Sequence, residues 1–460
     1  MLWLVLLVMG AAQGSDEVFH EAGEDLGSNA SNHSHHGIHL ASLRFPFVGA
    51  PLMITSFVIA VVLVKIGFEH LHVISRTLPE SCLLILLGVL IGAIFLLSGS
   101  DTFQLLEFDP DTFFLYLLPP IILEAAYSLR DRAFAENFGT ILLYAVVGTI
   151  LNWLLVGLGL WGLEVSGVLG LRIRLLDCFI FAALISAVDP VAVLAIFQEV
   201  GVNKMLYFMV FGESLLNDAV TVVLYTVLVT LTHMKEVVVQ DVLMGVLAFL
   251  VSSGGAILIG TFFGLFTGVI TKYTGKIRVV EPTTLFGIAY LSYLCAELFH
   301  FSGIISIICC GLVQSHFAME NISSKSYVSV HYFSKVISSV TESLIFIILG
   351  VMLVNDDFWR NGWHTRFCIY SLILVCFIRA IVVFFLAYIV NAHLAGIRSI
   401  SPKEQFIMAY GGLRGAVSFS LVFMLSGEET PLRDSLMCAT YIVILFTVFV
   451  QVYSSSISAQ

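Results

Sequence analysis

Residues 212–225 read GESLLNDAVTVVLY and place Glu213, Ser214, Asn217 and Asp218 in a stretch that is otherwise apolar. On an α-helix Ser214 and Asp218 share one face because they are four residues apart, and Glu213 and Asn217 share the adjacent face. The first face offers a carboxylate and a hydroxyl, which are oxygen ligands suited to a hard cation such as Na⁺. This stretch therefore predicts an ion site inside a helix.

The rest of the chain explains where such a helix lies. The 460 residues are 59% hydrophobic and 12% charged, with a mean hydropathy of +1.00. A soluble domain cannot bury that much apolar surface, so the composition predicts an all-α polytopic membrane protein. The net charge of −11 comes mostly from acidic loops, and no basic stripe suggests nucleic acid.

The N-terminal residues differ from the remainder. Residues 1–13 form an apolar run that is too short to span a bilayer and that ends in small residues, which predicts a signal peptide. Residues 14–44 are acidic and then His-rich, which predicts a disordered luminal or extracellular segment. Asn29 and Asn32 each begin an N-x-S sequon and are candidate glycosylation sites there.

Residues 45–453 form the predicted transmembrane domain, with about thirteen apolar segments. Loops assigned to the cytoplasm hold twelve basic residues, Lys65 among them, and outer loops hold seven. This bias places the N-terminus outside and leaves residues 454–460 as a short cytoplasmic tail. The segment at 242–270 is the one left unpaired, and it links two six-helix repeats of inverted orientation.

The fifth segment of each repeat carries helix breakers, which predicts two crossed broken helices around a midplane binding site. In the first repeat, Pro190 follows Asp189 and opens the helix, so that the main chain at Val188 is free to join Asp189 as an ion ligand. Asp189 also suits the N-cap of the half-helix that begins at Pro190, and the two roles are compatible. The breakers of the second repeat are Gly411, Gly412 and Gly415.

Besides Asp189 and Asp218, five charged residues lie in apolar segments, where each costs about 2.5 to 3.5 kcal/mol on insertion scales. Glu213 and Arg379 are expected to form a compensating pair, in which Glu213 does not titrate. Glu342 and Arg414 are expected to support the broken helices, because half-helix ends carry partial charges. Glu124 is the remaining intramembrane carboxylate.

Asp218 is then left without a permanent partner. A carboxylate buried in this way takes up a proton, and a bound cation drives the proton off. One site therefore binds Na⁺ or H⁺ in turn, which suffices for exchange if it can face either side. Two other classes use the same residues: a cation channel along the polar face, and an intramembrane protease with Asp189 and Asp218 as its dyad. No repeated filter loop supports the channel, and Ser214 and Asn217 suit ion ligation better than proteolysis.

Several stretches resemble the electroneutral sodium/proton exchangers of the solute carrier family 9 type, in the monovalent cation/proton antiporter superfamily. The resemblance covers residues 45–451. The matching stretches are FFLYLLPPIILEAAY at 113–127, ISAVDPVAVLAIFQEV at 185–200, VFGESLLNDAVTVVLY at 210–225, TESLIFIILG at 341–350 and AYGGLRGAVSFSL at 409–421.

The resemblance implies roles for the same residues. Asp218 would bind the ion or the proton, and Asn217 beside it would mark exchange of one Na⁺ for one H⁺. Asp189, Ser214 and the main chain of Val188 would complete the site, with Asp218 and Asp189 as the carboxylate ligands of Na⁺. The protein would be a homodimeric transporter in a lipid bilayer, with an elevator-like movement, no cofactor and no enzymatic activity. An inhibitor-linked region would comprise Phe113, Phe114, Leu115, Pro119 and Pro120.

Two features depart from the family pattern. Glu124 stands where many relatives have Asp, and the sequence ends in VYSSSISAQ, where relatives continue into a regulatory tail. A truncated form without tail-binding regulators is therefore expected. The stretches VLAIFQEV and NDAVTVVLY favour the plasma-membrane subgroup, where exchange of extracellular Na⁺ for intracellular H⁺ regulates cell pH, Na⁺ and volume. An inactive or dominant-negative form and an endosomal K⁺/H⁺ exchanger remain alternatives.

Overall fold

The computed structural model describes residues 45–70, 80–98, 110–189, 197, 203–234, 238–274, 277–354, 359–360, 362–393, 400–425, 430 and 432–451. These residues are helical or irregular, and they hold one isolated β-bridge and no strand. The predicted signal peptide at 1–13, the whole segment at 14–44 with Asn29 and Asn32, Pro190 and the tail at 454–460 lie outside them.

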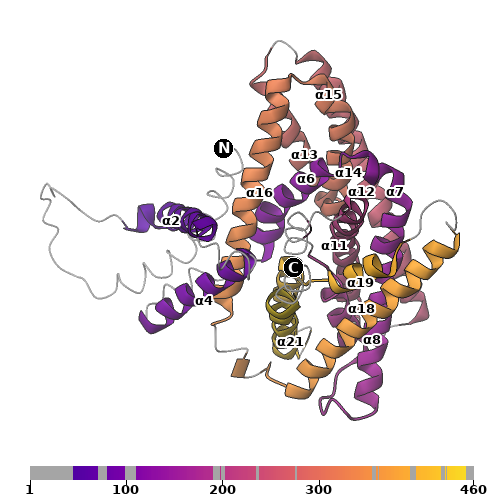
Figure 1. Cartoon of the computed structure of the whole chain (residues 1–460). Coiled ribbons are helices and arrows are strands. Elements are labelled where there is room, and N and C mark those ends of the chain that lie inside the picture. The colour runs from indigo at the N-terminus through magenta and orange to yellow at the C-terminus, as the bar shows by residue number, and fades with distance from the viewer. Residues whose placement is uncertain are drawn as a thin grey trace, which may run out of the picture.

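The described helices follow one another along the chain (Figure 1). They are α2 (Phe45–His70), α4 (Glu80–Ser98), α5 (Pro110–Thr112), η2 (Phe113–Leu117), α6 (Leu118–Ser128), α7 (Arg132–Leu142), η3 (Leu143–Gly148), α8 (Thr149–Val165), α9 (Leu175–Leu184), α11 (Lys204–Thr232), α12 (Val239–Tyr273), α13 (Val280–Leu298), α14 (Gly303–Val313), η4 (Gln314–Ala318), α15 (Met319–Asn321), α16 (Ser324–Met352), α18 (Thr365–His393), α19 (Pro402–Tyr410), α20 (Ala416–Phe423), α21 (Arg433–Leu445) and η5 (Phe446–Gln451), where η marks π-helical turns.

Short polar side chains set where several of these helices begin. Asn203 accepts a hydrogen bond from the N–H of Met205 at the start of α11. Ser401 and Glu404 form a reciprocal capping box at the start of α19, with Pro402 in its first turn. Such caps satisfy N–H groups that have no partner inside the helix. The sequence therefore fixes the ends of the helices that carry the site.

Prolines shape the entry into α6. Because Pro119 has no N–H, the carbonyl of Leu115 lacks its usual helical donor, and it accepts the hydroxyl of Tyr290 at 3.3 Å. The neighbouring carbonyl of Phe114 accepts the hydroxyl of Tyr293 at 2.8 Å. The π-helical segment η2 lies here, and such segments are frequent at functional sites. Two tyrosines of α13 therefore hold η2, the segment that leads into α6.

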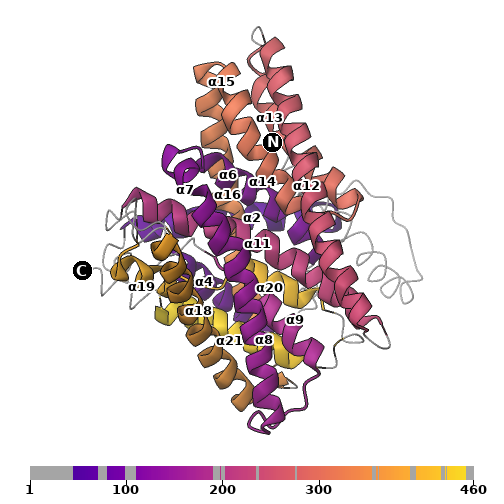
Figure 2. The ribbon, with the colours of Figure 1, turned by 90° about the vertical axis from the view of Figure 1, so that its right-hand side faces the viewer.

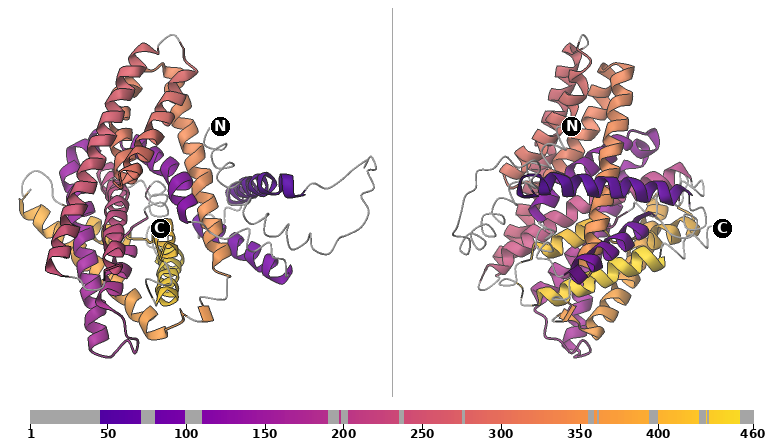
Figure 3. Two further views of the ribbon diagram at one scale, coloured as in Figure 1. Left: turned by 180° about the vertical axis from the view of Figure 1, so that it is seen from behind. Right: turned by 90° about the vertical axis from the view of Figure 1, so that its left-hand side faces the viewer.

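The helices pack as two groups that we name after their central members. The α16 group comprises α4, α6, α12, α13, α14 and α16, with α2 lying across α16 (Figure 3). The α11 group comprises α7, α8, α9, α11, α18, α19, α20 and α21. Contacts are extensive inside each group and sparse between them, apart from those of α11 with the following helix α12. Figures 1 and 2 both show α13 and α15 at one end of the molecule and α8, α18 and α21 at the other.

Seven described helices are long and apolar enough to cross a membrane, by length and composition. The all-helical polytopic architecture predicted from composition is therefore confirmed, whereas the total of thirteen segments stays a prediction. Lys65, which the sequence placed in a cytoplasmic loop, lies within α2 instead, because α2 continues to His70. The seven are Arg132–Val165, Lys204–Thr232, Val239–Tyr273, Gly303–Asn321, Ser324–Leu353, Thr365–Ala392 and Arg433–Gln451.

Candidate ion-binding site

The end of one helix and the break in another meet inside the α11 group. The first helix, α9, ends at Leu184, and a turn at Ile185 and Ser186 leads on to Asp189. The second is interrupted between α19 and α20. The N–H of Asp189 donates to the carbonyl of Leu413 at 2.8 Å, and the two residues form an antiparallel β-bridge. The segment after α9 is thus bonded to the break in the second helix.

Arg414 offsets the end of α9. Its Nη1 donates to the carbonyls of Ser186 at 2.9 Å and Ala187 at 3.1 Å, and the side chain is buried. Carbonyls at and just beyond the C-terminal end of a helix lack helical donors and lie where partial negative charge gathers. The buried guanidinium of Arg414 gives two such carbonyls a hydrogen-bond donor and offsets the negative charge.

The helix α11 holds the main chain at Val188 from both sides. The hydroxyl of Ser214 donates to the carbonyl of Val188, and the N–H of Val188 donates to Oδ1 of Asn217 at 3.2 Å. All three residues are buried. The serine oxygen keeps its lone pairs, and the Val188 carbonyl keeps one, so both oxygens remain available to a cation.

Glu213 and Arg379 form the ion pair that is predicted from the high cost of an unpaired charge in an apolar segment. Nη1 of Arg379 lies 2.5 Å from Oε1 of Glu213, and the two side chains are only 7% and 3% exposed. Nη2 of Arg379 also reaches the carbonyl of Met408 at 3.4 Å. A Cβ at Gly412 would lie 2.9 Å from Nε of Arg379, so this glycine makes room for the guanidinium. The pair therefore ties α11, α18 and α19 together.

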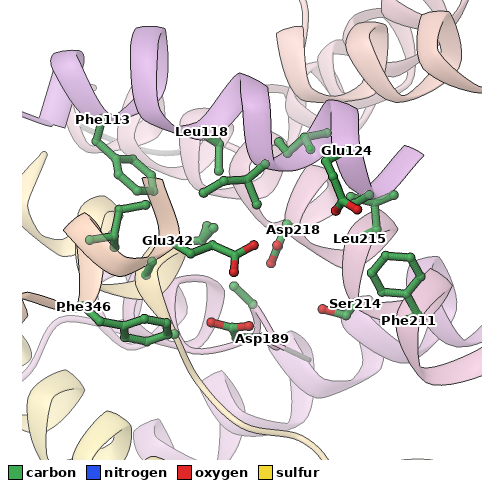
Figure 4. Close-up of a pocket in the computed structure, with 18 residues that line it drawn as sticks. Phe113, Leu118, Glu124, Asp189, Phe211, Ser214, Leu215, Asp218, Glu342 and Phe346 are labelled. Atoms are coloured by element: carbon green, nitrogen blue, oxygen red, sulfur yellow. The ribbon is translucent and has the colours of Figure 1, made fainter. Parts of the chain in front are cut away.

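A cavity of about 110 Å³ lies between the two helix groups, and its walls carry four carboxylates (Figure 4). Asp189 and Asp218 come from the α11 group, whereas Glu124 and Glu342 come from the α16 group. Figure 4 shows the carboxylates of Asp189, Asp218 and Glu342 turned toward a common space. Ser214 lines the same cavity, and the remaining wall is mostly aromatic and aliphatic.

The four carboxylates differ in their partners. Glu124 accepts a hydrogen bond from Ser128 at 2.9 Å, and Glu342 accepts one from Ser338 at 3.0 Å. In contrast, the side chain of Asp218 forms no hydrogen bond or ion pair with any residue that the structure describes. A carboxylate in this position can hold a proton or ligate a cation, and the nearby oxygens of Asp189 and Ser214 can complete a cation's shell.

The sequence did not place Glu124 and Glu342 in this cavity. Glu342, expected to support the broken helices, lines the cavity together with Asp189 and Gly415, and its described hydrogen-bond partner is Ser338. A partial signal exists in helical spacing, because Glu342 shares a face with Ile345 and Phe346, which also line the cavity. Which face of α16 turns toward α11 is decided by packing.

The region linked to inhibitors by resemblance is only partly on the cavity wall. Phe113 lines the cavity together with Leu118. Pro119 and Pro120 are buried in α6. Phe114 and Leu115 contribute main-chain carbonyls to the tyrosine contacts described above.

Membrane-length helices thus surround a helix end and a helix break that meet at a cavity lined by carboxylates, and a solved structure shares this fold. The sodium proton antiporter MjNhaP1 from Methanocaldococcus jannaschii has this fold: its structure matches with a TM-score of 0.65 at 20% identity, over 89% of this chain and 98% of that chain. Residues 52–458 match the family model described as "Sodium/hydrogen exchanger, transmembrane". The chain therefore belongs to the sodium/hydrogen exchanger family.

Curated relatives agree with this assignment. The chain is 51% identical over 433 residues to Na(+)/H(+) exchanger protein 7 of Caenorhabditis elegans, covering 94% of this chain and 55% of that protein. It is 45% identical over 412 residues to sodium/hydrogen exchanger 2 of Oryctolagus cuniculus, covering 89% and 50%. It is 40% identical over 418 residues to sodium/hydrogen exchanger 3 of Homo sapiens, covering 90% and 49%. The chain thus spans about half the length of these relatives.

Proposed function

We propose that this protein exchanges extracellular Na⁺ for intracellular H⁺, one for one, and so regulates intracellular pH, Na⁺ and volume. The observation that carries the proposal is Asp218, which faces a cavity between two helix groups and has no hydrogen-bond or ion-pair partner among the described residues. Membership of the sodium/hydrogen exchanger family supports Na⁺ and H⁺ as the two exchanged ions. The activity is transport, and no cofactor takes part in it.

Competition at one carboxylate supplies the coupling. When Na⁺ binds Asp218, with help from Asp189, Ser214 and the carbonyl of Val188, it stabilises the charged carboxylate and displaces the proton. When Na⁺ leaves, the desolvated carboxylate takes a proton back. Glu213 does not join this cycle, because Arg379 neutralises it. One titrating carboxylate then exchanges one proton for one Na⁺, and no net charge moves.

Alternating access follows from the way the helices pack. The cavity lies where the α11 group meets the α16 group, and contacts between the groups are sparse. Such an interface permits one group to slide against the other as a rigid body. A movement of the α11 group would carry Asp218 with the joint of the broken helices and open the cavity to either side in turn. The homodimer and the elevator-like movement implied by resemblance belong to this proposal.

Reconstitution tests the exchange directly. Purified protein in liposomes, with Na⁺ outside and a pH-sensitive dye inside, should alkalinise an acidic interior only when Na⁺ is present. Asp218→Asn should abolish this movement, because the amide cannot exchange a proton for Na⁺. Glu320→Gln is the matched control: Glu320 pairs with Arg130 on an exposed surface outside the cavity. Exchange by Asp218→Asn at the wild-type rate would overturn the site assignment.

Two further measurements separate the alternatives. Substituting K⁺ for Na⁺ in the same liposomes tests a K⁺/H⁺ exchanger, which would respond to K⁺ gradients. Clamping the membrane potential tests a channel, whose flux would follow the potential, whereas one-for-one exchange would not. Plasma-membrane location is part of the proposal as well, and surface biotinylation of intact cells should label the protein if it is correct.

A further inference from the structure

Glu342 stands across the cavity from Asp218 and belongs to the other helix group. It is carried by α16, and its carboxylate turns toward the space that Asp218 and Asp189 also face (Figure 4). Of the four carboxylates in the cavity, the exchange described above uses only Asp189 and Asp218. Glu342 is a further proton-accepting group there, and the exchange cycle gives it no part.

Polar groups lie beside Glu342 on α16. Ser338, one turn earlier, donates to Oε1 of Glu342 at 3.0 Å. The next residue, Ser339, accepts a hydrogen bond from Nζ of Lys65 at 2.5 Å, and the same Nζ lies 2.7 Å from Oε1 of Glu80. The side chains of Lys65 and Glu80 are 30% and 38% exposed. These groups lie toward the start of α16, on the side predicted to be cytoplasmic.

Charged groups from several elements surround Glu342. Glu124 of α6, Asp189 of the segment after α9 and Asp218 of α11 line the same cavity, and Lys65 of α2 bonds Ser339 on α16. Glu342 thus has both an acceptor for its proton in the cavity and a charged group on the side predicted to be cytoplasmic.

We propose that Glu342 is a second proton acceptor, which passes protons between Asp218 and the side of α16 on which Lys65 and Glu80 lie. The proposal rests on the proposed exchange and adds the route of its proton. A proton entering from that side forms an O–H bond at Glu342. As Na⁺ leaves Asp218, that bond breaks and an O–H bond forms at Asp218, directly or through one water. One proton moves, the charges balance, and no electron is transferred. Because Glu342 belongs to the α16 group, the transfer takes place only when the two groups are arranged as described here.

Comparing two kinds of exchange isolates this step. Purified full chain in liposomes of phosphatidylcholine and phosphatidylglycerol supports both Na⁺/H⁺ exchange, followed by the dye, and Na⁺/Na⁺ self-exchange, followed with ²²Na⁺. Only the first needs a proton. Glu342→Gln keeps the size of the side chain and an oxygen that accepts from Ser338, but it cannot carry a proton. Na⁺/H⁺ exchange by this variant should fall by about tenfold at alkaline pH, less than the 10² typical of a direct acid–base group because water can bridge the gap. It should recover as pH falls, since bulk protons then reach Asp218 unaided.

Self-exchange by Glu342→Gln should equal that of the wild type, and Glu342→Asp, which keeps a proton acceptor, should restore most of the Na⁺/H⁺ rate. Equal loss of both exchanges would mean that Glu342 holds Na⁺ or the fold, and would overturn the relay. Unchanged Na⁺/H⁺ exchange would also overturn it while leaving the proposed function intact. If the wild type itself moves no protons against Na⁺, the proposed function fails and the relay fails with it.

Discussion

The N–H of Val188 donates a hydrogen bond to Oδ1 of Asn217 at 3.2 Å, so a helix that carries the candidate ion site also holds the end of a broken helix. The carbonyl of the same residue accepts a hydrogen bond from Ser214, one turn earlier on α11. Val188 is thus fixed on both its donor and its acceptor side. The broken segment and α11 form one unit, which is what a site made from both requires.

Replacing Asn217 by Ala should damage this unit. The N–H of Val188 would be buried without a partner, which costs about 1 to 3 kcal/mol. Val188 would then be held only through its carbonyl, by Ser214, and its position would be less well fixed. We expect a lower thermal unfolding temperature in detergent and weaker ²²Na⁺ binding. Thr226→Ala offers a control on the same helix, because its hydroxyl bonds only within α11 and is exposed. Normal Na⁺ binding by Asn217→Ala would show that Val188 is held by other contacts.

Asn217→Asp tests a different property of the same residue. A carboxylate keeps an oxygen for the N–H of Val188, so the fold should persist. It also adds a second titrating group beside Asp218, and a second proton would then exchange for the same Na⁺. Flux in liposomes should consequently respond to an imposed membrane potential, whereas wild-type flux should not. If the membrane potential changes the flux of neither protein, Asn217 does not determine how much net charge each transport cycle moves.

The ion pair of Glu213 and Arg379 gives a prediction about stability. Removing either partner leaves a buried charge uncompensated, which costs about 3 to 5 kcal/mol, whereas replacing both by apolar residues is often neutral. Glu213→Leu and Arg379→Met should each lower the unfolding temperature strongly, and the double variant should recover much of the loss. The measurement is thermal unfolding of the purified protein, followed by its fluorescence. A double variant that is as unstable as the sum of the single variants would mean that the pair contributes more than mutual neutralisation.

Local chemistry accounts for the parts of this structure that the sequence predicts. Pairing of Glu213 with Arg379 follows from the cost of a single buried charge, and the second broken helix follows from its glycines. Long-range packing decides the rest. Local sequence does not predict that tyrosines of α13 bond the carbonyls of Phe114 and Leu115, or that Glu342 of α16 lines the same cavity as Asp218. Both contacts depend on how helices distant in sequence are rotated toward one another.

Gly415 lies against Asp189 so closely that any side chain there would disturb the site. A Cβ built on Gly415 would collide with Oδ2 of Asp189 and would lie only 2.5 Å from its Cβ. The backbone of Gly415 is extended, with φ of −139°, so alanine is disfavoured by the contact and not by its own conformation. Gly415→Ala should cost about 1 to 3 kcal/mol through overpacking and should displace the carboxylate. Its Na⁺ KM, from initial rates of exchange in liposomes, should rise. Gly162→Ala is the control, because nothing lies within 4 Å of a Cβ there, and it should leave transport unchanged. A wild-type KM for Gly415→Ala would remove Asp189 from the set of groups that hold the ion.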